Sequence, residues 1–320
     1  MSKTSIYFLL VLTCLASFLL AAGMGSVSIS FREILSGLST PGLPHTLVYE
    51  LRLPRAMAAF VCGGMLALAG LLMQVLLRNP LADPYILGVS GGAATGALLA
   101  ILFGLGSLMT QTAAFAGALL SIVLVFVLAH GQTSWTSNRL LLTGVILAAG
   151  WNAFISFILT ISPDQQIHGM LFWLMGDLSN TRVTAWHGFL LLAITIGGFF
   201  SARQLNILAR GELQASALGV NTRQLRILLF FSASLLTAIA ISLAGSIGFI
   251  GLMVPHMLRL MMGADHRALV PASVLLGGSL LVLADTFSRS VLAPIQIPVG
   301  ILTAALGVPT FLYLLYRNRT

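Results

Sequence analysis

The sequence predicts an all-α polytopic membrane protein with about ten transmembrane helices. Of its 320 residues, 58% are hydrophobic and 8% are charged, whereas about a quarter of the residues in soluble domains are charged. The mean hydropathy is +1.01. Because one span takes roughly 20 residues, the length allows about ten spans with short loops and leaves no segment for a sizeable soluble domain. We therefore expect residues 1–320 to form a single transmembrane domain.

Ten apolar runs, separated by polar turns, define the predicted spans. The first covers residues 6–22 after Lys3, where a retained anchor is a commoner start for such a chain than a cleaved signal peptide. The second begins at Pro54, because proline suits the first turn of a helix, and ends near Leu77. The other spans are predicted at about 85–105, 111–129, 140–161, 188–201, 227–244, 245–262, 268–288 and 298–316.

The distribution of basic residues orients these spans. With both termini in the cytoplasm, eleven basic residues lie inside, namely Lys3, Arg78, Arg139, Arg203, Arg210, Arg223, Arg226, Arg259, Arg267, Arg317 and Arg319. Five lie outside, namely Arg32, Arg52, Arg55, Arg182 and Arg289. This bias follows the positive-inside rule, and it accounts for the net charge of +8 without a nucleic-acid partner. Spans 2–5 and 7–10 then run in opposite senses, as an inverted repeat requires, although the two halves are too dissimilar in sequence to establish one.

A polar, basic loop over about residues 202–226 separates spans 6 and 7. Within it, Gly211–Leu218 is typical of a short helix, and Gly219 stands where a helix end favours a left-handed residue. Asn221 is then expected to be the N-cap of the next helix, with Gln224 as its capping-box partner. A folded loop of this kind indicates a docking surface for a cytoplasmic partner. A solvated linker whose arginines fix the topology is the alternative.

Several motifs are missing or have a structural explanation. Gly88, Gly92 and Gly96 recur every four residues, which favours close helix packing over a phosphate-binding loop. Lys3 is the only lysine, so the chain has no ATP-binding GK[ST] motif, and any ATP must be bound by another chain. No histidine pair has the spacing of metal ligands on a helix and no HExxH motif occurs, so we predict no metal site and no catalytic site.

Asp285 is the one carboxylate well inside a predicted span. An intramembrane carboxylate is typical of ion-coupled carriers, but Arg289 follows at i+4, which favours an ion pair on one helix face. On the outer side, Arg52 and Arg55 stand at the mouth of span 2, and Arg289 stands at the end of span 9. Their guanidinium groups could bind carboxylates of an external partner, with lipid headgroups as the alternative.

Four ordered segments resemble the FecCD family. They are VYELRLPRAMAAFVCGGMLALAGLLMQVLLRNPLADPYILGVSGGAATGA, FWLMGDLS, GSIGFIGLMVPHMLRLMMGADHRALVPAS and PVGILTAALGVPTFLYLL. The resemblance covers about residues 45–317 and implies a permease subunit of a type II ABC importer in the cell inner (cytoplasmic) membrane. Such an importer carries an iron–siderophore, haem or vitamin B12. It joins this permease to a second copy or a paralogue, two cytoplasmic ATPases that bind ATP and Mg²⁺, and a periplasmic or lipid-anchored substrate-binding protein.

The resemblance also implies roles for individual residues. The loop would couple to the ATPase through Arg210, Gly211, Glu212, Ala215, Leu218 and Gly219. The binding protein would dock on Arg52, Arg55 and Arg289, and a cytoplasmic gate would lie at Thr136, Ser137 and Asn138. The chain itself would need no cofactor and would not be an enzyme. The sequence does not identify the substrate, and an ion-coupled secondary transporter that uses Asp285 is the alternative.

Overall fold

The computed structural model describes residues 2–25, 27, 29–37, 42–129, 137–179 and 181–317, and these contain helices and no strand. The helices before residue 130 are α1 (Lys3–Gly23), α2 (Phe31–Ser36), α3 (Leu43–His45), the π-helical η1 (Thr46–Arg52), α4 (Leu53–Leu77), the 3₁₀ turn η2 (Pro84–Leu87), α5 (Val89–Leu102) and α6 (Ser107–Ala129). The later helices are α7 (Ser137–Ile161), α8 (Asp164–Met175), α9 (Ala185–Phe200), α10 (Ala202–Arg210), α11 (Glu212–Ala217), α12 (Thr222–Ala244), α13 (Ile250–Met262), α14 (His266–Ser288) and α15 (Val299–Arg317).

Each of the ten predicted spans corresponds to an apolar helix, but the helices differ in length. Six within the described residues are long and apolar enough to cross a membrane, namely α1, α4 with its preceding turns, α6, α7, α12 and α14. A seventh span forms if α9 and α10, which meet at 64°, count as one. The helices α5, α13 and α15 are shorter apolar helices. A 14-residue helix such as α5 is only about 21 Å long, less than the roughly 30 Å of a bilayer core.

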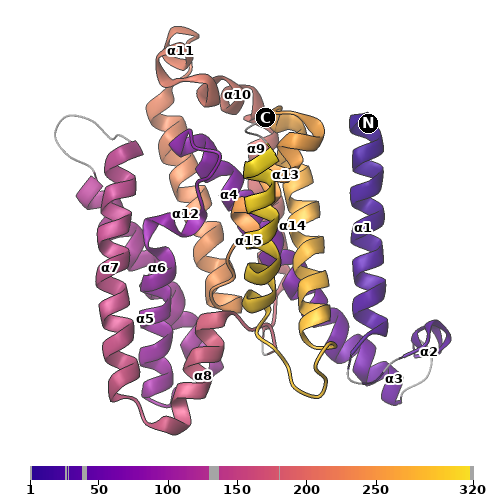
Figure 1. The fold of residues 1–320 in the computed structure, drawn as a ribbon. Helices are drawn as coiled ribbons and strands as arrows, with labels where there is room; N and C mark the ends of the chain where they lie inside the picture. Colours follow the sequence, from indigo (N-terminus) through magenta and orange to yellow (C-terminus); the bar gives the residue numbers. More distant parts are fainter. Residues whose placement is uncertain are drawn as a thin grey trace.

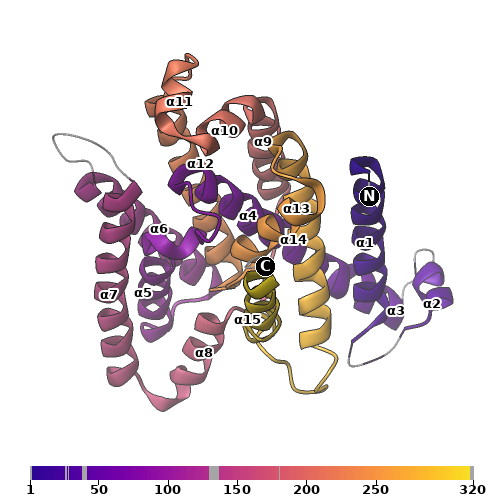
Figure 2. The ribbon, with the colours of Figure 1, turned by 45° about the horizontal axis from the view of Figure 1, so that its top comes forward.

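Helix α4 is the core of the bundle. Its most apolar stretch is 89% buried, whereas that of α7 is 11% buried. In Figures 1 and 2, α5–α8 lie on one side of α4 and α12, and α1 and α13–α15 lie on the other. Glycines permit the close approach at this centre, because a Cβ on Gly63 or Gly70 would overlap the carbonyl of Gly277 or Gly251. The predicted packing role of Gly92 and Gly96 is confirmed, since both backbones lie against α6, whereas Gly88 precedes α5 and lies against α7.

The helical backbone is interrupted directly before each of the short helices α5 and α13. Gly88 before α5 and Phe249 before α13 have nearly equal left-handed φ angles of 69° and 70°. The Tyr85 hydroxyl links the two breaks, because it donates to the Ile247 carbonyl at 3.1 Å and accepts from the Ile247 N–H at 3.2 Å. Non-helical backbone inside a membrane needs hydrogen-bond partners of this kind, because no water is present to supply them. Matching breaks at equivalent places in the two halves are what an inverted repeat predicts.

The two ends of the bundle carry different polar residues. We call the end that carries the N-terminus, α10 and α11 the loop end (Figure 1). There, Asp265 at the start of α14 accepts hydrogen bonds from Lys3 Nζ at 3.3 Å and from Asn206 Nδ2 at 3.0 Å. We call the opposite end the arginine end, because Arg52, Arg55 and Arg289 gather there at the start of α4 and the end of α14.

Candidate functional site

The loop between α9 and α12 folds into a bent pair of helices that we call the elbow, α10 and α11. Helix α10 buries the apolar side chains of Ala202, Leu205 and Leu208 against the bundle. The chain then turns at Gly211, whose φ of 146° suits glycine, and α11 follows. The predicted short helix is therefore confirmed, although α10 was not foreseen as a helix of its own.

The end of the elbow also follows the prediction. Gly219 has a φ of 79°, in the left-handed region. Asn221 is the N-cap of α12, and its side chain accepts from the N–H of Gln224 at 3.1 Å. These local signals were readable because a helix stop and a helix start each depend on only a few neighbouring residues.

A salt bridge holds the elbow on the bundle. Arg226 Nη1 of α12 lies 3.0 Å from both carboxylate oxygens of Glu212 in α11. The Arg226 side chain is only 8% exposed, and Arg78 Nη2 lies 3.9 Å from the same carboxylate. Ala215 is also buried. Glu212 and Ala215 therefore fix the position of α11 on the bundle. This role differs from the direct contact with the ATPase that the family resemblance implied for them.

Two large leucines are exposed on the outer surface of the elbow, one in α11 and one directly after it. Leu213 is 88% exposed and Leu218 is 69% exposed, and Arg210 beside them is also exposed. Leu213 was missed by sequence reasoning. Its signal is its position two residues before the buried Ala215, which places it on the opposite face of a helix. We call Leu213 and Leu218, the residue that follows the helix, the leucines of α11. Together they form an exposed apolar surface that a protein partner can cover.

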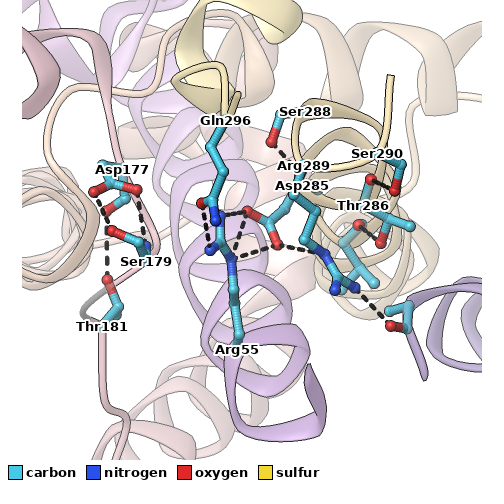
Figure 3. A network of polar contacts seen from close by, with 12 residues as sticks. Arg55, Asp177, Ser179, Thr181, Asp285, Thr286, Ser288, Arg289, Ser290 and Gln296 are labelled. Atoms are coloured by element: carbon cyan, nitrogen blue, oxygen red, sulfur yellow. Dashed lines mark hydrogen bonds and ion pairs between the residues drawn. The ribbon is translucent and has the colours of Figure 1, made fainter. Parts of the chain in front are cut away.

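The arginine end is a network of internal contacts (Figure 3). Arg55 of α4 binds Asp285 of α14 through Nε at 3.0 and 2.9 Å and Nη2 at 2.8 Å, and its Nη1 donates to Gln296 Oε1 at 3.1 Å. Arg289 Nε lies 3.7 Å from Asp285, so the predicted i,i+4 ion pair is present. However, the closer partner of Asp285 lies on another helix, which the sequence did not indicate.

The other two arginines bind the end of α1. Arg289 Nη2 donates to the Ala21 carbonyl at 2.6 Å, and Arg52 Nη1 donates to the carbonyls of Ala22 at 2.7 Å and Gly23 at 3.0 Å. Arg52 and Arg289 are 6% and 9% exposed. Burial lowers the pKa of Arg289 to about 10, and the Asp285 carboxylate opposes this shift, so the guanidinium stays charged near neutral pH. The network therefore ties α1, α4 and α14 together.

The structure brings the three predicted docking arginines together but gives them partners within the chain. They line a shared cavity of 340 Å³ with Ser179 and Gln296. Only Arg55, with 15% of its side chain exposed, is not fully enclosed. A role in binding the carboxylates of another protein stays a prediction. In this structure the same side chains stabilise the bundle.

The structure describes only part of the predicted cytoplasmic gate. Thr136 lies outside the described residues, Ser137 begins α7, and Asn138 is exposed in the first turn of that helix. The gate role therefore stays a prediction.

Among the described residues, no group of three or more His, Cys, Asp or Glu side chains is placed to hold a metal ion.

The fold is therefore a bundle of apolar helices of unequal length, with a folded polar elbow at one end. Residues 11–317 match the model of the FecCD transport family, and the chain belongs to that family. It is therefore a permease subunit of an ABC transporter.

Relatives and solved structures agree with this assignment. The chain is 40% identical over 323 residues to the hemin transport system permease protein HmuU of Yersinia pestis, covering 98% of this chain and 95% of that protein. It is 36% identical over 310 residues to the vitamin B12 import system permease protein BtuC of Escherichia coli O127:H6, covering 96% and 94%. It also matches the inward-facing structure of a metal-chelate type ABC transporter with a TM-score of 0.85 and 32% identity, covering 98% of this chain and 99% of that one.

Proposed function

We propose that this chain is the permease of an importer for a metal chelate, namely an iron–siderophore, haem or cobalamin. The observation that carries the proposal is the nearly full-length similarity to permeases named for hemin and vitamin B12. A match to a metal-chelate transporter over 98% of the chain supports the same substrate class. The relatives differ in their named substrates, so the choice among the three chelates is left to experiment.

The complete importer would contain partners on both sides of the inner membrane. A second permease, identical or paralogous, would complete the pathway, and two cytoplasmic ATPases would bind ATP and Mg²⁺. A periplasmic or lipid-anchored protein would deliver the substrate. Both termini and the elbow would lie in the cytoplasm, which agrees with the bias of basic residues toward that side. This chain would hold no cofactor and carry out no chemistry.

The elbow supplies a physical route for coupling. A partner seated on Leu213 and Leu218 would press on α11, which is joined to α12 by the Glu212–Arg226 salt bridge. Helix α12 packs along the central α4, so movement of the elbow is passed to the core as a rigid-body displacement. ATP-driven closure of the ATPase pair would thereby tilt the helices and alternate access to the substrate pathway.

An ion-coupled carrier that uses Asp285 is the alternative. Such a carrier needs a carboxylate that gains and loses a proton during transport. Asp285 instead accepts three hydrogen bonds from Arg55, which join α14 to α4. This contact favours a structural role for Asp285. The importer and the carrier also differ in their energy source, which is ATP hydrolysis for the importer and an ion gradient for the carrier.

The composition and activity of the complex test the proposal. The chain would be tagged in its native host, purified in detergent, weighed by native mass spectrometry, and reconstituted with its binding protein for uptake of haem, a ferric siderophore and cobalamin. We expect two permeases, two ATPases and uptake that needs ATP hydrolysis. A bare permease dimer that transports a chelate on an ion gradient would contradict the proposal and favour the carrier.

A further inference from the structure

A cleft at the loop end lies beside the elbow and is not explained by it. It has a volume of 510 Å³ and is bounded by the end of α4, by α10 and by the turn between α13 and α14. Its polar lining consists mainly of Gln74, Arg78, Arg210, Arg259, Asp265 and His266. Arg210 directly precedes the turn into α11, so a protein seated on the leucines of α11 would overlie the mouth of the cleft.

The cleft carries an excess of positive charge. Among the described residues, three guanidinium groups line it, from Arg78, Arg210 and Arg259, against one carboxylate of the lining. That carboxylate, Asp265, is already bound by Asn206 at 3.0 Å and by Lys3 at 3.3 Å. Arg259 donates to the Gln74 side-chain oxygen, which is neutral. The cleft therefore suits an anionic group that would accept hydrogen bonds from the arginines.

The lining also contains an unused polar atom. His266 is 3% exposed, and its Nδ1 lies 2.6 Å from Asn206 Oδ1. Its Nε2 is buried and has no hydrogen-bond partner among the described residues. Asn206 Oδ1 can only accept a hydrogen bond, so the ring donates through Nδ1 and Nε2 is left as an acceptor, which would not itself bind an anion.

Arg78 is the most unusual residue of the cleft. It ends α4 with φ 51° and ψ 37°, a left-handed conformation. Helices that end in this way generally use glycine or asparagine there, because a longer side chain is less stable in that conformation. Its contact with Glu212 is long, at 3.9 Å, and its side chain is 41% exposed. Strained residues of this kind are found where function requires the side chain.

We propose that this cleft receives an acidic side chain of the cytoplasmic ATPase, as a second anchor beside the leucines of α11. The inference rests on the proposed function, because it names a further contact of the same docking surface. The leucines supply an apolar contact that tolerates sliding and rotation. A carboxylate held by the guanidinium groups of Arg78 and Arg210 fixes the orientation of the ATPase on the permease.

Substitution of Arg78 tests the anchor without endangering the fold. Arg78→Gly removes the guanidinium group and supplies the residue that the left-handed conformation favours. We expect its thermal unfolding temperature to equal or exceed that of the wild type. We also expect its dissociation constant for the purified ATPase to rise at least about 30-fold, as when one partner of a buried charge pair is removed. Arg78→Gln, which keeps a long side chain, should lose the same affinity.

Arg203→Gln is the matched control. Arg203 is an exposed arginine of α10 at the same end that does not line the cleft, so its loss should weaken binding by less than about fivefold. Binding would be measured in nanodiscs of phosphatidylcholine alone. Unchanged affinity of both Arg78 variants overturns the proposal, and so does an equal loss in Arg203→Gln. If the Arg78 effect appears only when anionic lipid is added, a lipid headgroup is the occupant and the proposal is wrong. If the wild-type permease binds no ATPase, the proposed function itself fails.

Discussion

The two ends of the molecule both concentrate arginine, but they use it in opposite ways. At the arginine end, Arg52, Arg55 and Arg289 donate to main-chain carbonyls and to Asp285, and they hold three helices together. At the loop end, Arg78 and Arg210 face a cleft beside exposed leucines. The difference is that the arginines of the arginine end are bound by close partners within the chain, whereas Arg78 has only a long contact of 3.9 Å with Glu212 and stays partly exposed.

The largest expected effect is the loss of Asp285 at the arginine end. Asp285→Ala leaves Arg55 and Arg289 without their carboxylate, and breaking a buried ion pair in this way costs about 3–5 kcal/mol of stability. Thermal unfolding of the detergent-purified protein measures it. Glu50→Ala removes an exposed carboxylate near the same end and should have little effect. A stable Asp285→Ala protein that has lost only transport would instead support the carrier.

The second effect concerns the apolar surface of the elbow. Leu213→Asp places a charge where we expect a partner to cover a leucine, and should weaken ATPase binding by about 2 kcal/mol without lowering the stability of the permease. Binding and thermal unfolding are measured on the same preparation. Gln204→Asp, which introduces a carboxylate on the exposed side of α10, is the control. Equal binding by Leu213→Asp and wild type would show that the ATPase sits elsewhere.

A smaller effect separates docking from coupling. Glu212→Gln weakens the link between α11 and α12 by about 1 kcal/mol, because the amide lacks the charge that binds Arg226. We expect the ATPase to bind and hydrolyse ATP while uptake per ATP falls several-fold. Uptake and hydrolysis would be measured together in proteoliposomes. Unchanged coupling would show that the salt bridge is not part of the route.

The smallest effect is a pH dependence at the loop end. Hydrogen bonds, first of all from Asn206, lower the pKa of Asp265 below its usual value. The stability that Asp265 adds is therefore present above the unfolded pKa of about 3.9 and is lost as the pH falls through the lower folded value. Because this side chain is 39% exposed, Asp265→Asn should lower stability by less than about 1 kcal/mol at pH 7. The difference from wild type should shrink as the pH falls below the unfolded pKa, and a difference that grows in acid would contradict this assignment.

The sequence predicted the features that depend on neighbouring residues. The ten apolar helices, the α11 helix, the left-handed Gly219 and the N-cap at Asn221 all follow from composition or from signals within a few positions. The interruptions before α5 and α13 could not be predicted from the sequence. They depend on hydrogen bonds between the Tyr85 hydroxyl and the Ile247 backbone, which lie far apart in the sequence. Helix α8 was hidden for a similar reason, since its polar first half resembles a loop.

The partners of the arginines could not be predicted either. Arg55 and Asp285 are 230 residues apart, and only the packing of α4 on α14 brings them together. The same holds for the cleft, whose polar lining comes from α4, α10, α13 and the start of α14. The side of α11 that faces outward follows from the Glu212–Arg226 salt bridge and the burial of Ala215, so the exposure of Leu213 became clear only in the structure.

Site-specific photocrosslinking tests the contrast between the two ends most directly. A photoreactive amino acid would replace Leu213 at the loop end and, in a second protein, the exposed Leu292 at the arginine end. After irradiation of membranes from the native host, crosslinked partners are identified by mass spectrometry. We predict that position 213 captures a protein with an ATP-binding GK[ST] motif and that position 292 does not. An intact complex with no ATPase crosslink at position 213, or an ATPase captured at position 292, would contradict the account.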